Sequence, residues 1–222
     1  MKGETGSKKV YQSFGGHGMD VSINRADDLD KVTLNHVGAK ESPSVLDLGC
    51  GAGGQSLRLA LGGATVTALD KFDFRELIAA EMKLQKISEE KLKFIHGDIS
   101  SLENLLQGEQ YSDVSMQRTL HYLPYTDALK LLKYLHSVVT DKMFVSVTGL
   151  SSQVAFDYPA LSLPIENRFS VLHPVQAEIF GIHEPVCLYY EVEFVSLLEE
   201  SGWKVEKVWV SAFGNIKAVC HH

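Results

Sequence analysis

The sequence predicts an α/β fold with a doubly wound, mostly parallel sheet of seven strands. Three observations lead to this prediction. Short apolar runs alternate with helical patterns between residues 44 and 149, which is typical of repeated βα units. A glycine-rich turn follows the first of these runs, at residues 49–54. Near the C-terminus, two further apolar runs joined at Gly214-Asn215 predict an antiparallel hairpin that closes one edge of the sheet.

The expected elements follow one another in a regular order. We expect strands at residues 45–48, 65–69, 92–95, 114–116 and 143–147, the last rich in β-branched residues. Helices are expected at 53–62, 74–86, 101–106 and 127–139, where apolar side chains recur at helical spacing. A last helix at 190–201 precedes the hairpin strands, 205–210 and 216–220. Strand and helix therefore alternate through most of the chain.

The length suits one ordinary domain, which we place at residues 44–222. Residues 1–43 are polar and irregular apart from a helical stretch around 26–37, and we expect them to form an arm or cap outside the core. Residues 150–189 break the alternation and contain four of the six prolines, Pro159, Pro164, Pro174 and Pro185. Because such long connections are uncommon in compact domains unless they cover a site, we predict a substrate lid there.

Composition excludes several function classes. The net charge of -7 argues against a nucleic-acid partner, which normally requires clustered Lys and Arg. Cys50, Cys187 and Cys220 form no close pair of the kind that holds zinc or a disulfide, so we expect free thiols and a cytoplasmic protein. No apolar run reaches the roughly 18 residues of a membrane span. Histidines in the 150–189 segment match no standard ligand spacing, and we expect no metal.

The turn after the first strand has the composition of a nucleoside-binding loop. Asp47 lies in the strand, and the glycines that follow let a ligand approach the backbone without a side chain intervening. Gly49, Gly51 and Gly54 also satisfy the dinucleotide pattern G-x-G-x-x-G, so the loop alone leaves the cofactor open. Asp70 ends the second strand, where a carboxylate can accept hydrogen bonds from ribose hydroxyls. A nucleoside cofactor at this sheet edge is therefore expected.

Several motifs together resemble one family. Residues 45–54, Asp70, Asp98 and residues 113–123 are similar to the successive motifs of class I S-adenosylmethionine-dependent methyltransferases. The resemblance covers residues 44–149 and, more loosely, 190–220. It implies a seven-stranded Rossmann-like methyltransferase sheet with S-adenosylmethionine as the cofactor. Two other hypotheses stay open: a nicotinamide-dependent oxidoreductase, and a methyltransferase-fold protein that has lost catalysis and acts as a binding partner.

By this resemblance the methionine portion of the cofactor passes Gly49 and Gly51, and Asp70 holds the ribose. Around the adenine, Lys71 or Phe72 flanks the ring, Asp98 meets its exocyclic amine and Ile99 packs on its face. Gln117 sits near the methionine and the sulfonium. Phe72 could equally be a core residue, and Asp98 could equally be a helix N-cap. The full set of expected cofactor residues is Asp47, Gly49, Cys50, Gly51, Gly53, Asp70, Lys71, Phe72, Asp98, Ile99 and Gln117.

The methyl acceptor is expected to face the same strand ends. His121 is the best candidate for a general base, although a histidine there also commonly packs under the sheet edge. Arg118 either clamps an anionic acceptor or pairs with a nearby acid, and Tyr122 is expected to contact the acceptor. No Asp/Asn-Pro-Pro-Tyr follows the fourth strand, unlike in enzymes that methylate the exocyclic amines of nucleic-acid bases. We therefore expect a small-molecule acceptor or a protein side chain.

Arms of this family often fold over the bound cofactor. Tyr11 and Phe14, beside Gly15 and Gly16, have the composition of such a segment. A disordered tail is the alternative.

Overall fold

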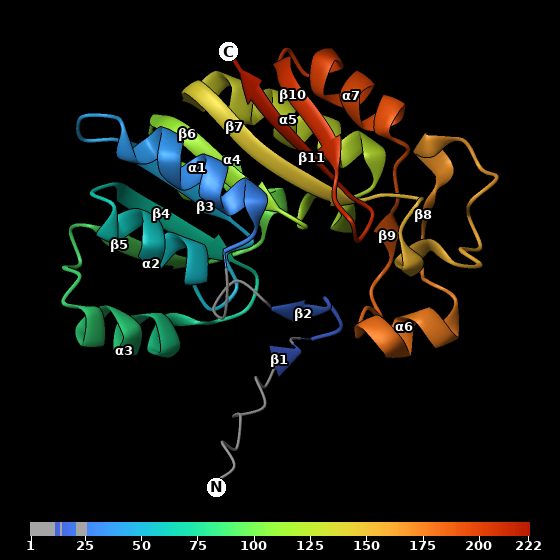
Figure 1. The fold of residues 1–222 in the computed structure, drawn as a ribbon, viewed down its shortest axis with the longest axis horizontal. Helices are drawn as coiled ribbons and strands as arrows, with labels where there is room; N and C mark the ends of the chain where they lie inside the picture. Colours follow the sequence, from blue (N-terminus) through green and yellow to red (C-terminus); the bar gives the residue numbers. More distant parts are fainter. Residues whose placement is uncertain (1–11, 14, 21–25) are drawn as a thin grey trace, which may run out of the picture.

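The central feature of the computed structural model is a seven-stranded sheet with the order β10-β11-β7-β6-β3-β4-β5 (Figure 1). The structure describes residues 12–13, 15–20 and 26–222, so Tyr11 and Phe14 lie outside the described residues. Six strands run in the same direction, and only β11, which lies between β7 and β10 in this sheet, runs antiparallel to them. The predicted doubly wound sheet and C-terminal hairpin are confirmed. The strands are β3 (Ser44–Leu48), β4 (Thr65–Asp70), β5 (Leu92–His96), β6 (Tyr111–Gln117), β7 (Val139–Thr148), β10 (Lys204–Val210) and β11 (Asn215–His221).

Helices cover both faces of the sheet because successive side chains of each strand point to opposite sides. In β3, Leu46 and Leu48 belong to the core under α4 (Leu102–Leu106), α5 (Tyr125–Val138) and α7 (Glu191–Glu200). Val45 belongs to the opposite core, under α2 (Gly54–Leu61) and α3 (Arg75–Gln85). None of the described helices is long and apolar enough to cross a membrane.

Helix α1 (Asp28–Gly38) is part of this packed layer, which differs from the expectation of an arm outside the core. Leu29 is fully buried and packs in one cluster with Phe144 of β7 and Val219 of β11. Val37, at the other end of the helix, joins the core under α2. The polar sequence around these apolar residues is the exposed face of an amphipathic helix, so the domain includes residues from α1 onward.

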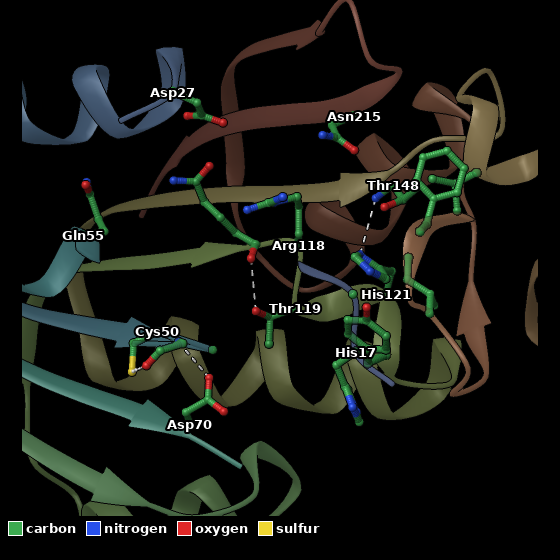
Figure 2. Close-up of a pocket in the computed structure, with 18 of the residues that line it drawn as sticks. His17, Asp27, Cys50, Gln55, Asp70, Arg118, Thr119, His121, Thr148 and Asn215 are labelled. Carbon is green, nitrogen blue, oxygen red and sulfur yellow. Dashed lines mark hydrogen bonds between the residues drawn. The ribbon is translucent and has the colours of Figure 1, made fainter. Parts of the chain in front are cut away.

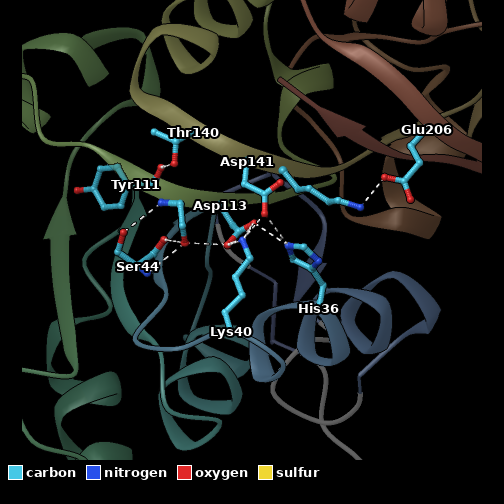
Figure 3. A network of polar contacts seen from close by, with 10 residues as sticks. His36, Lys40, Ser44, Tyr111, Asp113, Thr140, Asp141 and Glu206 are labelled. Atoms are coloured by element: carbon cyan, nitrogen blue, oxygen red, sulfur yellow. Dashed lines mark hydrogen bonds and ion pairs between the residues drawn. The ribbon is translucent and has the colours of Figure 1, made fainter.

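An ion-pair network fastens the C-terminal end of α1 to the beginnings of β6 and β7 (Figure 3). The Lys40 ammonium lies 2.6 Å from a carboxylate oxygen of Asp113 and 2.6 Å from one of Asp141. His36 Nε2 lies 3.0 Å from Asp113, whose side chain is fully buried. His36 and the two aspartates are grouped as metal ligands could be. The lysine already supplies the positive charge there, so the group acts as a clamp on α1.

Residues 150–189 fold into a small unit beside the carboxyl ends of the strands. Tyr158, Leu172, Ile182 and Val186 are buried in a cluster of their own. The Tyr158 hydroxyl donates toward the carbonyl of Val186 at 2.6 Å. The unit contains η3 (Gln153–Ala155), η4 (Ile165–Asn167), β8 (Phe169–Ser170), α6 (Pro174–Phe180) and β9 (Val186–Cys187), with β8 and β9 paired.

Part of the N-terminal arm lies against this unit. The Gly18 amide donates to the carbonyl of Gly181 at 2.9 Å, and the His183 amide donates to that of Gly16 at 2.8 Å. The arm also contains the short paired strands β1 (Gln12–Ser13) and β2 (Met19–Asp20). Residues 16 and 18 therefore contact the 150–189 unit, while the ring of His17 packs against Phe72 and Tyr122.

Candidate functional site

A cavity of about 730 Å³ opens at the carboxyl ends of the parallel strands (Figure 2). Its walls come from the loop after β3, the ends of β4 and β6, the start of α1, residues 17–18 and the 150–189 unit. This volume is within the usual range for small-molecule sites, about 300 to 1,000 Å³. All but one of the predicted site residues line it: Asp47, Gly49, Cys50, Gly51, Asp70, Lys71, Phe72, Asp98, Ile99, Gln117, Arg118, His121 and Tyr122.

The glycine loop owes its shape to two residues with left-handed backbone conformation, Gly49 (φ 67°) and Gly51 (φ 54°). The Gly49 amide donates to the carbonyl of Leu69 at 2.8 Å, which fixes the loop against β4. A Cβ atom on Gly49 would lie 1.9 Å from Thr119 Oγ1, so no larger residue fits there. The loop therefore presents backbone to the cavity, as the sequence predicted.

Gly53 is the predicted site residue that the cavity lining does not include. It is the N-cap of α2 with φ 81°, and a Cβ atom there would lie 2.9 Å from Cγ1 of Ile78. Close packing of α2 against α3 accounts for the glycine. A sequence pattern cannot distinguish this packing need from a ligand contact, because both demand the same residue.

Asp70 is held rigidly at the end of β4. One carboxylate oxygen accepts the Gly51 amide at 2.8 Å, and the other accepts the Phe72 amide at 2.9 Å. The side chain is nearly buried, with 9% of the residue exposed. Hydrogen bonds of this kind favour the charged carboxylate, so the cavity has a fixed acceptor beside the glycine loop.

Asp98 is a helix N-cap and Phe72 packs in the core, which are the structural alternatives considered for them. Both residues also line the cavity. Asp98 is the N-cap of a short helix, η1 (Ile99–Ser101), and accepts the Ser100 amide at 2.9 Å. Although burial acts to raise it, hydrogen bonds from Ser100 bring the pKa of Asp98 below its usual value. Phe72 packs against the core under α2 and also lies edge-on to the His17 ring, 5.2 Å between centroids.

One end of the cavity, near α1 and β3, is acidic. Asp30 and Asp47 are each 4% exposed. Gln117 donates its amide to Asp30, and Ser56 Oγ donates to Asp47 at 2.6 Å. Burial raises the pKa of Asp47 to about 6 and also raises that of Asp30. Because buried carboxylates gain most from a positive partner, this end suits a cationic group of a ligand.

The opposite end contains His121 and Arg118, which come from the segment after β6 (Figure 2). The Thr148 amide donates to His121 Nδ1 at 3.4 Å, which leaves the proton of the neutral ring on Nε2. Burial first, and then the charge of Arg118, lower the pKa of His121 to about 3. Such a ring stays neutral near neutral pH and can donate a hydrogen bond through Nε2. Its predicted role as a base is not favoured by this environment.

Some cavity residues were not anticipated from the sequence. His17 comes from the arm, Asp30 from α1 and Asn215 from β11. For Asp30 a local signal exists, since Asp27 and Asp30 form a capping box at the start of α1, but this pattern indicates a helix end and not a site. The others are brought in by tertiary packing, which no local pattern reports.

The comparisons with known proteins agree with this site. A family model described as a methyltransferase domain matches residues 45–142. A sterol 24-C-methyltransferase of Pneumocystis carinii is 35% identical over 68 residues. This segment is 30% of the present chain and 18% of the sterol enzyme, so the chain matches less than a fifth of the length of that enzyme.

Solved structures are similar over most of the chain. The 1,6-didemethyltoxoflavin-N1-methyltransferase of Burkholderia thailandensis, bound to 1,6-didemethyltoxoflavin and S-adenosylhomocysteine, matches with a TM-score of 0.64 and 17% identity, over 90% of this chain and 78% of that one. Magnesium protoporphyrin IX methyltransferase of Synechocystis PCC 6803, with bound S-adenosylhomocysteine, matches with a TM-score of 0.60 and 19% identity, over 87% and 81%. At this identity the likeness establishes the fold.

Proposed function

We propose that the chain is a class I S-adenosylmethionine-dependent methyltransferase that transfers a methyl group to a small molecule bound in the cavity beside the cofactor, which the methyltransferase-domain match over residues 45–142 supports. The observation that carries the proposal is the fixed Asp70 carboxylate at the glycine loop, with buried acids on one side and an apolar, lid-like unit on the other. Two similar structures are methyltransferases whose names state small-molecule substrates, which supports this class of acceptor.

The described residues fit S-adenosylmethionine as the cofactor. When bound, it supplies an electrophilic methyl group on a sulfonium, and the electron pair of the broken S–C bond stays on sulfur. We assign the ribose hydroxyls to Asp70, an acceptor fixed by two backbone amides. We assign the positive charges of the methionine portion to the end formed by Asp30, Asp47 and Gln117, where burial makes a cationic partner favourable.

The adenine belongs, in this proposal, between Phe72 and Ile99, with Asp98 at its amine. All three line the same wall of the cavity, and the Asp98 side chain is already oriented by Ser100. The His17 ring against Phe72 encloses this end further. Exclusion of water here strengthens each polar contact to the nucleoside.

For catalysis we propose positioning in place of a strong base. Alignment of the reactants can account for about 7 to 11 kcal/mol of a barrier, more than the roughly 3 to 5 kcal/mol of a typical general base. His121 then acts as a neutral donor that orients the acceptor through Nε2. Residues 150–189, which supply Val154, Phe180 and Ile182 to the wall, form the acceptor lid.

Titration calorimetry tests the cofactor assignment. The wild-type protein should bind S-adenosylhomocysteine and give no heat with NAD, and the reverse would favour an oxidoreductase. Asp70→Ala should weaken S-adenosylhomocysteine at least about tenfold, because a charged acceptor of hydroxyl hydrogens is lost. The matched control is Asp73→Ala, an exposed acid on the same loop. Unchanged affinity of the Asp70 variant would refute the assignment.

Turnover tests the enzymatic part. Incubation with S-adenosylmethionine and a panel of small-molecule acceptors should release S-adenosylhomocysteine with at least one acceptor. Cofactor binding without release across a broad panel would favour a binding protein that has lost catalysis.

A further inference from the structure

The acceptor end of the cavity contains a cation that has no partner among the described residues. Arg118 is half-buried at the end of β6 and lines the cavity. Within the part of the chain that the structure describes, its guanidinium has no hydrogen bond and no carboxylate at salt-bridge distance. A guanidinium does not lose its proton in proteins, so it cannot relieve its burial by becoming neutral. Its charge is left for a ligand to match.

The backbone holds this side chain in place. Arg118 has φ 53°, in the left-handed region that residues other than glycine seldom adopt. Its amide donates to the carbonyl of Ser146 at 2.9 Å and lies 3.1 Å from Ser146 Oγ, which fixes the conformation against β7. Strained residues of this kind persist only where surrounding contacts enforce them, and they cluster at binding sites. Arg118 therefore combines an uncommon backbone conformation with a place in the cavity wall.

The surroundings of Arg118 differ from those of the cofactor groups. In Figure 2 its side chain is drawn between Asp27, whose carboxylate is paired with Lys217, and Asn215, Thr148 and His121, away from Cys50 and Asp70. After burial, the charge of Arg118 is the next cause that lowers the pKa of His121. The neutral His121 ring offers an N–H donor beside the guanidinium. An anionic group of a ligand can accept hydrogen bonds from both the Arg118 guanidinium and the His121 ring.

The remaining wall of this end is largely apolar. Tyr122, Val154, Phe180 and Ile182 line it, and all four also pack on or within the core of the 150–189 unit. Aliphatic and aromatic side chains recognise the apolar body of a ligand, and a few polar groups fix its orientation. A single cation in such a wall therefore selects for one charged group on an otherwise apolar molecule.

We propose that the acceptor is an apolar small molecule bearing a carboxylate or similar anion, which Arg118 binds and His121 Nε2 assists. The inference rests on the proposed function, because it names the acceptor class of the same cavity. Arg118 is thus a specificity-determining residue. Acceptors of the same shape without the anion bind weakly, since the guanidinium then stays buried and unmatched.

The test uses naphthoate and its neutral isostere naphthamide as probes, titrated by calorimetry into protein saturated with S-adenosylhomocysteine. The wild type should bind naphthoate at least about tenfold more tightly than naphthamide, because hydrogen bonds to charged groups are the stronger ones. Arg118→Met should abolish this preference by weakening naphthoate, while naphthamide should bind at least as tightly as it does to the wild type. Arg118→Lys should keep part of it, since the charge remains and the planar fork is lost. Arg75→Met, on an exposed arginine of α3, is the control and should keep the full preference.

Three results would overturn the proposal: no naphthoate binding by the wild type, equal affinity for the two probes, or a preference that survives Arg118→Met. A fourth would reassign the residue. If Arg118→Met weakens S-adenosylhomocysteine but not methylthioadenosine, which lacks the amino-acid portion, Arg118 binds the cofactor carboxylate. Failure of the proposed function is a separate result, namely wild-type protein that does not bind S-adenosylhomocysteine at all.

Discussion

Replacing Asp47 by asparagine should stabilise the protein at neutral pH and lose this benefit as the pH falls. Asp47 is buried between β3 and α2, and burial raises its folded pKa to about 6. In the unfolded chain an aspartate titrates near 3.9. The folded state therefore binds this proton more tightly. The contribution of protonated Asp47 to the free energy of unfolding is complete below about pH 4 and is lost as the pH rises through about 6.

The size of the effect follows from the two pKa values. A difference of about two units corresponds to about 3 kcal/mol over the whole range. Between about pH 5 and pH 7.5 the wild type should lose about 1.4 kcal/mol relative to Asp47→Asn. The amide oxygen of the variant can still accept the Ser56 hydroxyl, and any other change in packing gives an offset that does not depend on pH.

The assay is urea denaturation of both proteins across this pH range, with the difference in unfolding free energy plotted against pH. Ser56→Ala is the matched variant, because it removes the donor that lowers the pKa of Asp47 and keeps the carboxylate. The unfolding free energy of Ser56→Ala should fall more steeply between these pH values than that of the wild type, whereas Asp47→Asn should lack this fall. A difference between wild type and Asp47→Asn that stays constant with pH would refute the reasoning, since Asp47 would then be ionised without cost.

Three further changes test how the cavity is supported. Lys40→Met should cost about 3 kcal/mol in urea denaturation, because the fully buried Asp113 carboxylate loses its ammonium partner; a loss under about 1 kcal/mol would mean that the clamp on α1 contributes little. Gly53→Ala should lower the melting temperature more than Gly63→Ala, since both have positive φ but only Gly53 faces a side chain of α3 at contact distance; equal losses would contradict the packing role. Arg168→Met should speed proteolysis within residues 150–189 more than it lowers global stability, because this guanidinium joins the unit to α7 through a 2.6 Å ion pair; cleavage at the wild-type rate would argue that the unit's own core suffices.

The sheet could be predicted because its evidence is local. Alternating apolar runs, the glycine turn at Gly49 and Gly51, and Asp70 at a strand end each follow from a short stretch of sequence. Parallel strands bring their carboxyl ends to one edge, so residues far apart in the chain could be placed in one cavity. All the predicted site residues except Gly53 line this one cavity, and their roles in binding remain predictions.

The rest depended on contacts that the sequence does not report. The polar stretch before residue 43 concealed α1, whose few apolar residues, Leu29 and Val37, complete a core formed by distant strands. The protonation state of a side chain also depends on contacts with residues that are distant in the sequence. The family position of His121 suggested a base, yet its burial and the amide of Thr148 make the ring a neutral donor. The spacing of residues in the sequence predicts which side chains lie in the same site. Their burial and neighbouring charges in the folded structure determine their protonation states.

The charge pattern of the cavity also predicts which atom of the acceptor is methylated. If Arg118 binds the anion of the acceptor, the ion pair is strongest before reaction. Methylation of that same anion would remove its charge in the transition state, so the arginine would stabilise the ground state more and slow the transfer. The methylated nucleophile should therefore be a second group on the molecule, with the anion serving as an anchor. Mass spectrometry of the product after mild alkaline hydrolysis checks this: a methyl group that survives agrees, whereas a methyl ester that is cleaved would contradict the anchoring role of Arg118.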